Sequence, residues 1–351
     1  MKKVLVTGMA GFIGYHLSKL LIENEYEVVG LDTINDYYDV DLKLYRLAKL
    51  GFSSENIQYN KLLTFKNSSF IKLDLIDLEN MKILFKTQKF DYVINLAAQA
   101  GVRYSLENPH KYVNSNITGF LNILECCRAY PVKHLIFASS SSVYGLSKQI
   151  PFDIDNCSDH PISMYAASKK SNEMMAHTYA HLFGVPSTGL RFFTVYGPLG
   201  RPDMALHIFT KAIVEDKEFD VYNYGNMSRD FTYVNDITES IKRLIPLAPR
   251  TSNVTFDSKH PKPSKSTAPY QLFNIGNNDP ILLLDFIKII EQVVGKKGKM
   301  QLKPIQDGDV ESTYADVDSL FEYIDFKPST SVKKGIKAFV EDYLKYKNRK
   351  N

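Results

Sequence analysis

A tyrosine and a lysine four residues apart are the pair in this sequence best suited to acid–base chemistry. Tyr165 and Lys169, in the run Tyr-Ala-Ala-Ser-Lys, are expected on one face of a helix, because residues at i and i+4 lie one turn apart. A phenol has an ordinary pKa of about 10 and is a poor base at neutral pH. The Lys169 cation, and any further positive charge bound nearby, would both lower the pKa of Tyr165 and favour the tyrosinate.

A strand that ends in hydroxyl groups is expected beside this pair. Residues 134–139 form a mostly apolar run, typical of a strand buried on both faces, and the run Ala-Ser-Ser-Ser-Ser-Val-Tyr-Gly begins at Ala138. Ligands of an open parallel sheet bind beyond the carboxyl ends of its strands. These serines would therefore present hydrogen-bond donors to such a ligand.

Three glycines near the N-terminus form a turn suited to a pyrophosphate. Gly8, Gly11 and Gly14 follow an apolar strand at 4–7 and open a helix at 11–23. Glycine permits a tight turn and a close approach of the backbone, and the helix N-terminus supplies free amides and a favourable dipole. The sequence therefore predicts a dinucleotide-binding turn.

An acidic residue ends the second strand, expected at 27–32. The carboxylate of Asp32 would accept hydrogen bonds from the ribose hydroxyls of an adenosine and repel a 2′-phosphate. Neither Leu31 nor Thr33 brings a compensating positive charge. The sequence therefore favours NAD over NADP.

The next two strands, expected at 70–74 and 92–96, also end in residues that would line the crevice. The first of these ends would bind the adenine edge, and the second lets the backbone pass close to the cofactor because its residues are small. The residues concerned are Asp74, Leu75, Leu96, Ala97 and Ala98.

Apolar runs and helix-like segments alternate through the first half of the chain, which predicts a doubly wound parallel sheet, a Rossmann-type α/β fold. A sixth strand is expected at 187–192, and the clearest later helices at 113–129 and 165–183. Past residue 195 this alternation weakens. We therefore expect a nucleotide-binding core at 1–195, to which some later segments return, and a smaller C-terminal substrate-binding lobe at 196–351.

Composition excludes several classes of protein. A formal net charge of +4 over 351 residues is too small to indicate a nucleic-acid partner, and no apolar run reaches the roughly 18 residues of a membrane span. Three cysteines cannot form a disulfide framework, so the reducing cytoplasm is expected. His177 and His181 are one turn apart, but they have no acidic residue between them and no evident third ligand, so no metal is expected.

The motifs GxxGxxG, NLAA, SSSSVYG and YAASK together resemble the extended short-chain dehydrogenase/reductase superfamily, which binds NAD(P) on a Rossmann fold. Within it, the segments LDTINDYYDVDLK, AAQAGVRYSLENPHKYVNSN, LRFFTVYGPLGRPDM and RDFTYVNDI are most similar to the UDP-glucuronate 4-epimerases among the nucleotide-sugar epimerases. The match extends from Met1 to about Asp318. It implies an isomerase with tightly retained NAD, a UDP-sugar substrate and a homodimer built on the helices at 113–129 and 165–183.

The resemblance assigns roles residue by residue. The catalytic residues are Ser140, Tyr165 and Lys169. The cofactor-binding residues are Gly8, Gly11, Phe12, Ile13, Gly14, Asp32, Asp74, Leu75, Leu96, Ala97, Ala98, Asn116, Tyr165 and Lys169. The substrate-binding residues are Arg103, Ser141, Ser142, Thr194, Arg201, Arg229 at the phosphates, Gln306 and Asp309 at the uridine, and Thr313.

The implied reaction is a transient oxidation of the sugar at C4. Tyr165 removes the proton of the 4-hydroxyl while the C4 hydride passes to the nicotinamide, Ser140 binds the developing ketone, and Lys169 holds the nicotinamide ribose. The 4-keto sugar then turns about its link to the diphosphate, and hydride returns to the other face. Dehydratases and decarboxylases of the family usually carry an acidic residue where this chain has serines, which argues against both reactions.

UDP-glucuronate and UDP-galacturonate are the expected substrate pair. A C6 carboxylate beside a C4 ketone must be held in the plane that resists loss of CO₂. Ser141, Ser142 and Thr194 offer hydroxyl donors for this, and Arg201 brings a positive charge. Thr313 is small and stands at the position that gates N-acetyl groups, so UDP-N-acetylglucosamine remains an alternative, as does UDP-glucose.

Two further alternatives share the cofactor residues. A net dehydrogenase or reductase would accumulate NADH with its substrate, whereas a non-catalytic NAD-sensing protein usually lacks the tyrosine or the lysine. The chain departs from the family pattern at Met9, Leu199 and Asn235, where alanine, tryptophan and aspartate are common. Of these, Leu199 bears most on substrate choice, because it lies in the turn-rich run at 197–202, from which we expect a substrate-covering lobe to emerge.

Overall fold

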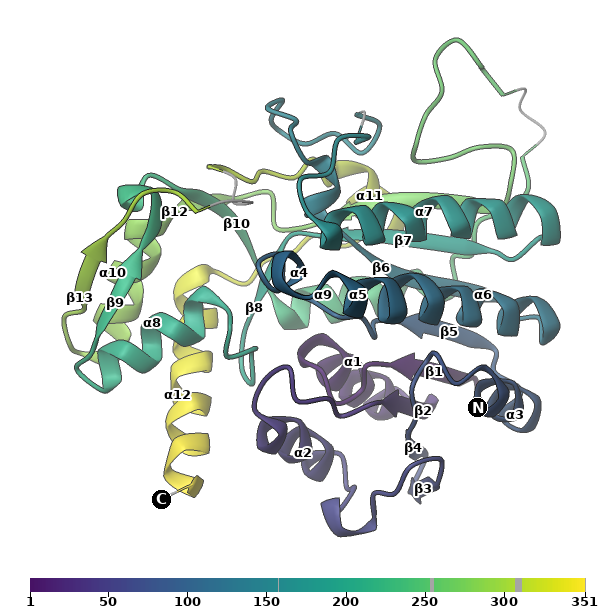
Figure 1. Cartoon of the computed structure of the whole chain (residues 1–351), viewed down its shortest axis with the longest axis horizontal. Coiled ribbons are helices and arrows are strands. Elements are labelled where there is room, and N and C mark those ends of the chain that lie inside the picture. Colours follow the sequence, from purple (N-terminus) through teal and green to yellow (C-terminus); the bar gives the residue numbers. More distant parts are fainter. Residues whose placement is uncertain (157, 253–255, 307–310, 351) are drawn as a thin grey trace.

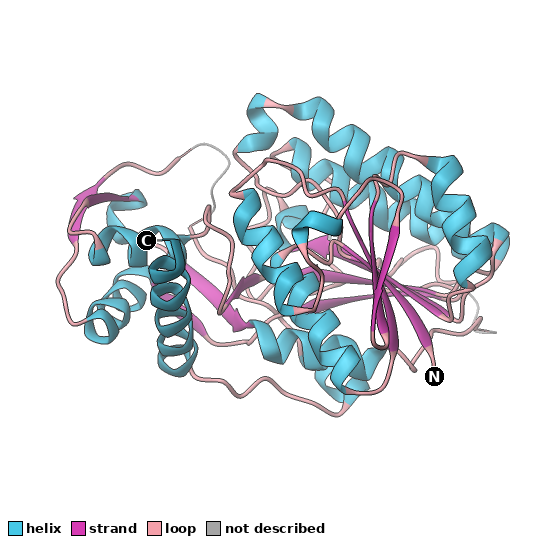
Figure 2. Ribbon diagram, turned by 90° about the horizontal axis from the view of Figure 1, so that it is seen from below, coloured by secondary structure: helices cyan, strands magenta, loops and turns pink. Residues whose placement is uncertain are grey.

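A computed structural model describes residues 1–156, 158–252, 256–306 and 311–350. In this part of the chain the centre is an eight-stranded sheet with helices on both faces, and a smaller lobe lies beside it (Figures 1 and 2). In spatial order the strands are β11 (Tyr270–Ile275), β7 (Ser187–Phe192), β6 (His134–Ser140), β5 (Tyr92–Asn95), β1 (Lys3–Thr7), β2 (Glu27–Asp32), β4 (Ser68–Lys72) and β3 (Leu62–Phe65).

Alternate residues of the central strand β1 face opposite helical layers. Val4 and Val6 pack into one apolar cluster, and Leu5, between them, packs into the other; all three are fully buried. The first layer contains α1 (Phe12–Glu23), α2 (Val40–Lys49), α9 (Val234–Leu244) and α11 (Asp318–Ile324). The second contains α3 (Leu78–Gln88), α6 (Gly119–Ala129) and α7 (Met164–Phe183). A strand buried on both faces needs the continuous apolar run seen in the sequence.

The doubly wound parallel fold is confirmed, with differences at its edges. All pairs in the large sheet are parallel except β3 with β4, and the sequence analysis did not foresee β3 or β11. The strand expected at 70–74 ends earlier, at Lys72, and Asp74 makes a turn in which its carboxylate accepts the Ile76 N–H at 3.1 Å. The helix expected at 113–129 begins with a π-helical turn at Val113–Thr118.

The smaller lobe holds an apolar cluster of its own and two small sheets. In it Phe231 and Phe286 stack with ring centroids 4.0 Å apart. Its elements are β8 (Thr194–Tyr196), β9 (Glu218–Val221), β10 (Ser228–Tyr233), β12 (Pro280–Leu282), β13 (Lys299–Leu302), α8 (Ala205–Val214), α10 (Leu283–Val294) and α12 (Val332–Lys350). A domain boundary at residue 195 stays a prediction, since β8 crosses it while α9, β11 and α11 pack with the core.

Several segments that connect the strands and longer helices form short helices. These are α4 (Tyr104–Glu107), α5 (Pro109–Tyr112) and the 3₁₀ turns Ser54–Asn56, Ser141–Tyr144 and Tyr222–Gly225. Among the described residues, no helix is long and apolar enough to cross a membrane.

A buried ion pair joins α7 to two central strands. Glu173 on α7 is 1% exposed and Arg191 on β7 is 0% exposed. One Glu173 oxygen accepts from Arg191 Nε at 2.8 Å and from Ser139 Oγ at 2.7 Å, and the other accepts from Arg191 Nη2 at 2.9 Å. Burial alone would raise the pKa of Glu173, but the Arg191 charge and these hydrogen bonds hold it below its ordinary value.

Removing the charge of Glu173 is expected to destabilise the fold strongly. Glu173→Gln leaves the Arg191 guanidinium buried without a counter-charge, which costs about 3–5 kcal/mol. The control, Glu79→Gln, breaks a pair with Lys82 in which the Glu79 side chain is 81% exposed, and it should change stability by less than about 1 kcal/mol. Urea unfolding followed by circular dichroism measures both variants, and equal effects would contradict the expectation.

Candidate active site

A cavity of about 1220 Å³ runs from the glycine turn, past the carboxyl ends of the central strands, to the smaller lobe. This is larger than the roughly 300–1,000 Å³ typical of a single drug-sized ligand. Most of the expected site residues line it. They are Gly8, Gly11, Phe12, Ile13, Gly14, Asp32, Asp74, Leu75, Leu96, Ala97, Ala98, Arg103, Ser140, Ser141, Ser142, Tyr165, Lys169, Thr194, Arg201 and Arg229.

Three of the expected site residues that the structure describes are not on this wall. Asn116 is buried behind it and holds the backbone of Gln99, whose N–H it accepts at 2.8 Å and whose carbonyl it binds at 3.0 Å. Thr313 is buried against β10, with its hydroxyl 3.4 Å from the Asp230 N–H. Gln306 has a buried side-chain carbonyl without a hydrogen-bond partner among the described residues. Asp309 lies outside the described residues.

The glycine turn has the form that a pyrophosphate requires. Gly8 has a positive φ of 77°, and a Cβ there would lie 3.0 Å from the Ala97 nitrogen. A Cβ on Gly14 would collide with the Gly8 carbonyl. No side chain caps the start of α1, so its first amides stay available to an anion. The departure at Met9 fits too, because Met9 is buried against Gly30, which has no side chain to displace it.

Asp32 is held rigidly at the end of β2. Its two carboxylate oxygens accept from the Ala10 N–H at 3.1 Å and the Ile34 N–H at 2.8 Å. Each oxygen keeps capacity for a second hydrogen bond, as a pair of ribose hydroxyls requires. Asp32, the glycine turn and the uncapped helix therefore fit NAD.

Lys43 is a cavity residue that the sequence analysis missed. Its ammonium lies 2.6 Å from both the carbonyl and the side-chain oxygen of Asn35, and the residue is 4% exposed. Burial raises the pKa of Asp32, and the Lys43 charge acts to lower it. The sequence analysis considered only the neighbours Leu31 and Thr33, whereas the fold brings the positive charge of Lys43 near Asp32 from α2.

The three residues expected to be catalytic meet at the end of β6. Ser140 lies beside Tyr165, close enough to act on the pKa of its phenol, and Ser140 Oγ accepts the Ser142 N–H at 3.2 Å. Lys169 is buried and donates to the Ala138 carbonyl at 2.8 Å. The phenol and a hydroxyl are thus placed to act on one substrate oxygen.

The electrostatics of Tyr165 differ from the expectation. Burial raises the pKa of the Tyr165 phenol; Ser140 and the charge of Arg201 only partly oppose this, and Lys169 is not among the groups that lower it. Burial also lowers the pKa of Lys169 to about 8. Without cofactor, the phenol is therefore protonated at neutral pH.

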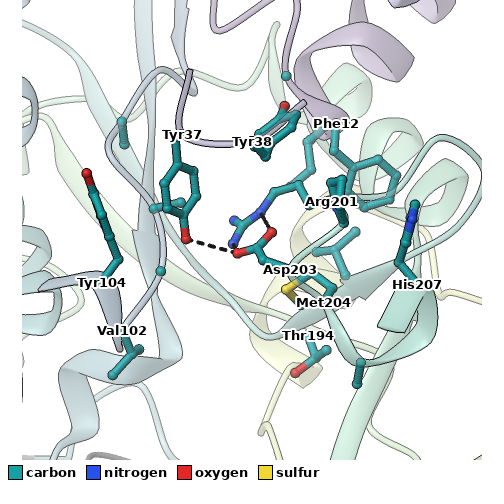
Figure 3. Close-up of a pocket in the computed structure, with 18 of the residues that line it drawn as sticks. Phe12, Tyr37, Tyr38, Val102, Tyr104, Thr194, Arg201, Asp203, Met204 and His207 are labelled. Atoms are coloured by element: carbon teal, nitrogen blue, oxygen red, sulfur yellow. Dashed lines mark hydrogen bonds and ion pairs between the residues drawn. The ribbon is translucent and has the colours of Figure 1, made fainter. Parts of the chain in front are cut away.

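Arg201 does not meet the cavity as a lone charge. Asp203 accepts from its Nε at 3.0 Å and from its Nη2 at 2.6 Å, and the Tyr37 hydroxyl donates to Asp203 at 3.0 Å (Figure 3). Thr194 and His207 line the same pocket (Figure 3). Tyr37 belongs to the LDTINDYYDVDLK segment that carried the family resemblance, which was the one signal for it.

Two arginines approach the cavity from opposite halves of the protein. Arg103, in the segment that follows β5, lies over the ring of Tyr222 at 5.2 Å from its centroid. Arg229 on β10 donates to the carbonyls of Ser228 and Glu311 at 2.9 and 3.0 Å. Both positions suit a diphosphate that spans the core and the smaller lobe.

The fold and this cavity define a nucleotide-binding protein of the Rossmann class. A model of the NAD dependent epimerase/dehydratase family matches residues 4–254. The chain is 53% identical over 344 residues to protein CapI of Staphylococcus aureus, covering 98% of this chain and 99% of that protein. It is 45% identical over 341 residues to a probable UDP-glucuronate 4-epimerase of Rhizobium meliloti, covering 97% and 96%.

A solved structure is similar over almost the whole chain. It is the UDP-glucuronic acid 4-epimerase of Bacillus cereus in complex with UDP-glucuronic acid and NAD, with a TM-score of 0.83, 30% identity and coverage of 98% of this chain and 99% of that one. The chain belongs to the NAD-dependent epimerase/dehydratase family, and its cofactor is NAD.

Tyr165→Phe is expected to abolish most of the turnover and leave the fold intact. The variant keeps the ring in place and removes the acid–base group, so kcat should fall about 10²- to 10⁴-fold. Epimer formation followed by proton NMR measures this, and the NAD released on denaturation is the control for cofactor binding. Retention of more than half of the wild-type activity would show that Tyr165 is not the base.

Asp32 and Lys43 are expected to set cofactor choice together. Asp32→Ser removes the repulsion of a 2′-phosphate and leaves Lys43 beside it, so affinity for NADP should rise about tenfold or more relative to NAD. Adding Lys43→Met should cancel most of that gain. Equilibrium dialysis of protein freed of cofactor measures both affinities, and unchanged NADP binding by Asp32→Ser would refute the expectation.

Proposed function

We propose that this isomerase interconverts UDP-glucuronate and UDP-galacturonate by NAD-dependent epimerisation at C4. The observation that carries the proposal is that Tyr165 and Ser140 lie together in one cavity with Thr194 and Arg201. The epimerases of Rhizobium meliloti and Bacillus cereus described above support it, because both are named for UDP-glucuronate.

Each step of the reaction has a residue placed for it. Tyr165 accepts the proton of the sugar 4-hydroxyl, and Ser140, beside the phenol, donates to the oxygen as it becomes a carbonyl. Bound NAD supplies the oxidant for C4 and a positive charge near the phenol. Lys169 is anchored on the Ala138 carbonyl and holds the wall beside Tyr165. The ketone then turns within the cavity, and Tyr165 returns the proton to the oxygen as C4 regains its hydride on the other face.

Hydrogen-bond donors in the cavity support UDP-glucuronate over an uncharged UDP-hexose as the substrate. Asp203 already engages two nitrogens of Arg201, so a C6 carboxylate would bind the remaining Nη1 together with the hydroxyls of Ser141, Ser142 and Thr194. Hydrogen bonds to a charged group contribute about 1.5–3 kcal/mol each, so two of them give a large preference over an alcohol.

We also propose an oligomeric state and a cellular location. A homodimer built on α6 and α7 is supported by apolar side chains that both helices expose, namely Leu121, Met164, Met174, Leu182 and Phe183. A cytoplasmic location rests on the small number of cysteines in the sequence.

The wild type is expected to turn over UDP-glucuronate at least tenfold more efficiently than UDP-glucose. Thr194→Val and Arg201→Ala should each lower kcat/KM for the uronate about 10- to 100-fold and lower that for UDP-glucose less, because the alcohol forms no charge-assisted bond. Proton NMR with each UDP-hexose supplies the rates. Equal turnover of both substrates by the wild type would refute the carboxylate argument, whatever the variants did.

A further inference from the structure

A fully buried arginine lies between the glycine turn and the substrate loop, defined as residues 197–203. Arg46 on α2 is 0% exposed, and among the described residues none of its hydrogen bonds goes to a carboxylate. Its Nη1 donates to the Ala10 carbonyl at 2.9 Å and to the Tyr38 hydroxyl at 2.6 Å. Its Nε and Nη2 both donate to the Leu199 carbonyl, at 3.2 and 2.6 Å. A buried charge that binds only neutral groups needs a reason to be there.

Leu199 is held on its other side by a carboxylate. Its N–H donates to Asp342 of α12 at 3.1 Å, so the backbone of this one residue is fixed between an anion and a cation. Leu199 has φ of +53°, a left-handed conformation that a leucine rarely adopts. Its side chain is buried in the core cluster. These contacts therefore hold a conformation that the residue type itself disfavours.

The conformation of Leu199 decides where the substrate loop points. Two residues later Arg201 reaches the cavity wall, followed by Asp203. Two more contacts fix the loop to the N-terminal half: His16 Nε2 lies 2.8 Å from the Pro198 carbonyl, and the Tyr37 hydroxyl donates to Asp203. The loop is thus anchored chiefly by α1, α2 and the segment before α2, although in the chain it lies between β8 and α8 of the smaller lobe.

We propose that Arg46 and Asp342 are positioning residues, which keep Leu199 left-handed so that Arg201 stays at the cavity wall. Neither residue lines the cavity. Because Arg46 also binds Ala10, whose N–H is bonded to Asp32, the same contacts tie the loop to the cofactor site. The functional part of this proposal rests on the proposed function, in which Arg201 binds the substrate.

Substitution of Asp342 is a more decisive test than substitution of Arg46. Asp342 is only half-buried on α12, so its variants are expected to fold. Asp342→Ala removes the acceptor of the Leu199 N–H, whereas the control Asp342→Asn keeps an acceptor oxygen. In the holoenzyme, Asp342→Ala should speed hydrogen exchange of the 197–204 segment about tenfold or more. It should raise KM for UDP-glucuronate about 5- to 20-fold and change kcat less than about threefold, with bound NAD as in the wild type. Asp342→Asn should stay within about twofold of the wild type in each measurement.

Arg46→Met should reproduce the effects of Asp342→Ala, and Arg46→Lys, which keeps a charge and one donor to the Leu199 carbonyl, should restore part of the loss. If Arg46→Met does not fold, the Asp342 pair decides alone. Exchange and KM in Asp342→Ala equal to those of Asp342→Asn would overturn the proposal. So would loss of bound NAD in parallel with the rise in KM, because that indicates general unfolding.

The failure of the proposed function would look different. If the wild type did not turn over UDP-glucuronate, the exchange measurements would still show whether Arg46 and Asp342 hold the loop. Fast exchange in Asp342→Ala would then support the positioning role on its own, and wild-type exchange would overturn it.

Discussion

The buried ion pair between Glu173 and Arg191 fixes how close α7 lies to β6, and therefore how close Tyr165 lies to Ser140. Ser139 and Arg191 are partners in the pairing of β6 with β7, and Glu173 binds both of them. One turn earlier on α7, Lys169 binds the Ala138 carbonyl. The helix is therefore attached at two successive residues of β6, and the next residue is Ser140. These bonds are shielded from water, so breaking any one of them would leave a buried polar group unpaired. That cost holds α7 against β6 and keeps Tyr165 beside Ser140.

Sequence reasoning recovered the parts of the site that lie on single strand-to-helix connections. The glycine turn, Asp32 and the serine run each follow a strand directly, and the topology of a parallel sheet brings such ends together without further information. Contacts between residues that are far apart in the sequence could not be predicted. Arg46 and Leu199 are far apart in sequence, and only the packing of α2 against the core brings them together. The sequence around α2 did not show which of its residues point inward.

In the free protein the pKa of Tyr165 is raised, whereas the sequence predicted a lowered pKa with both Lys169 and an oxidised nicotinamide beside the phenol. Spacing on a helix correctly put Lys169 one turn from the phenol, but the same burial that makes the pair useful raises the pKa of the phenol and lowers that of the ammonium. A buried tyrosine becomes a base only when additional positive charge stands beside it. In this cavity that charge comes from Arg201 and from whatever cation binds next to Tyr165, so the base is active chiefly in the loaded enzyme.

The pair of Arg201 with Asp203 gives the cavity a directional rather than a purely electrostatic means of choosing its ligand. A lone arginine at a cavity wall would attract any anion, and nucleotide sugars all carry a diphosphate. Paired with Asp203, the guanidinium attracts distant anions less and offers its remaining hydrogens in a fixed direction, set by two bonds to the carboxylate and by Tyr37 behind it. In the proposed function, discrimination between a carboxylate and an alcohol at C6 would then depend on the position of a few donors. Such a site needs a rigid loop, and the left-handed Leu199, held on both sides, supplies that rigidity.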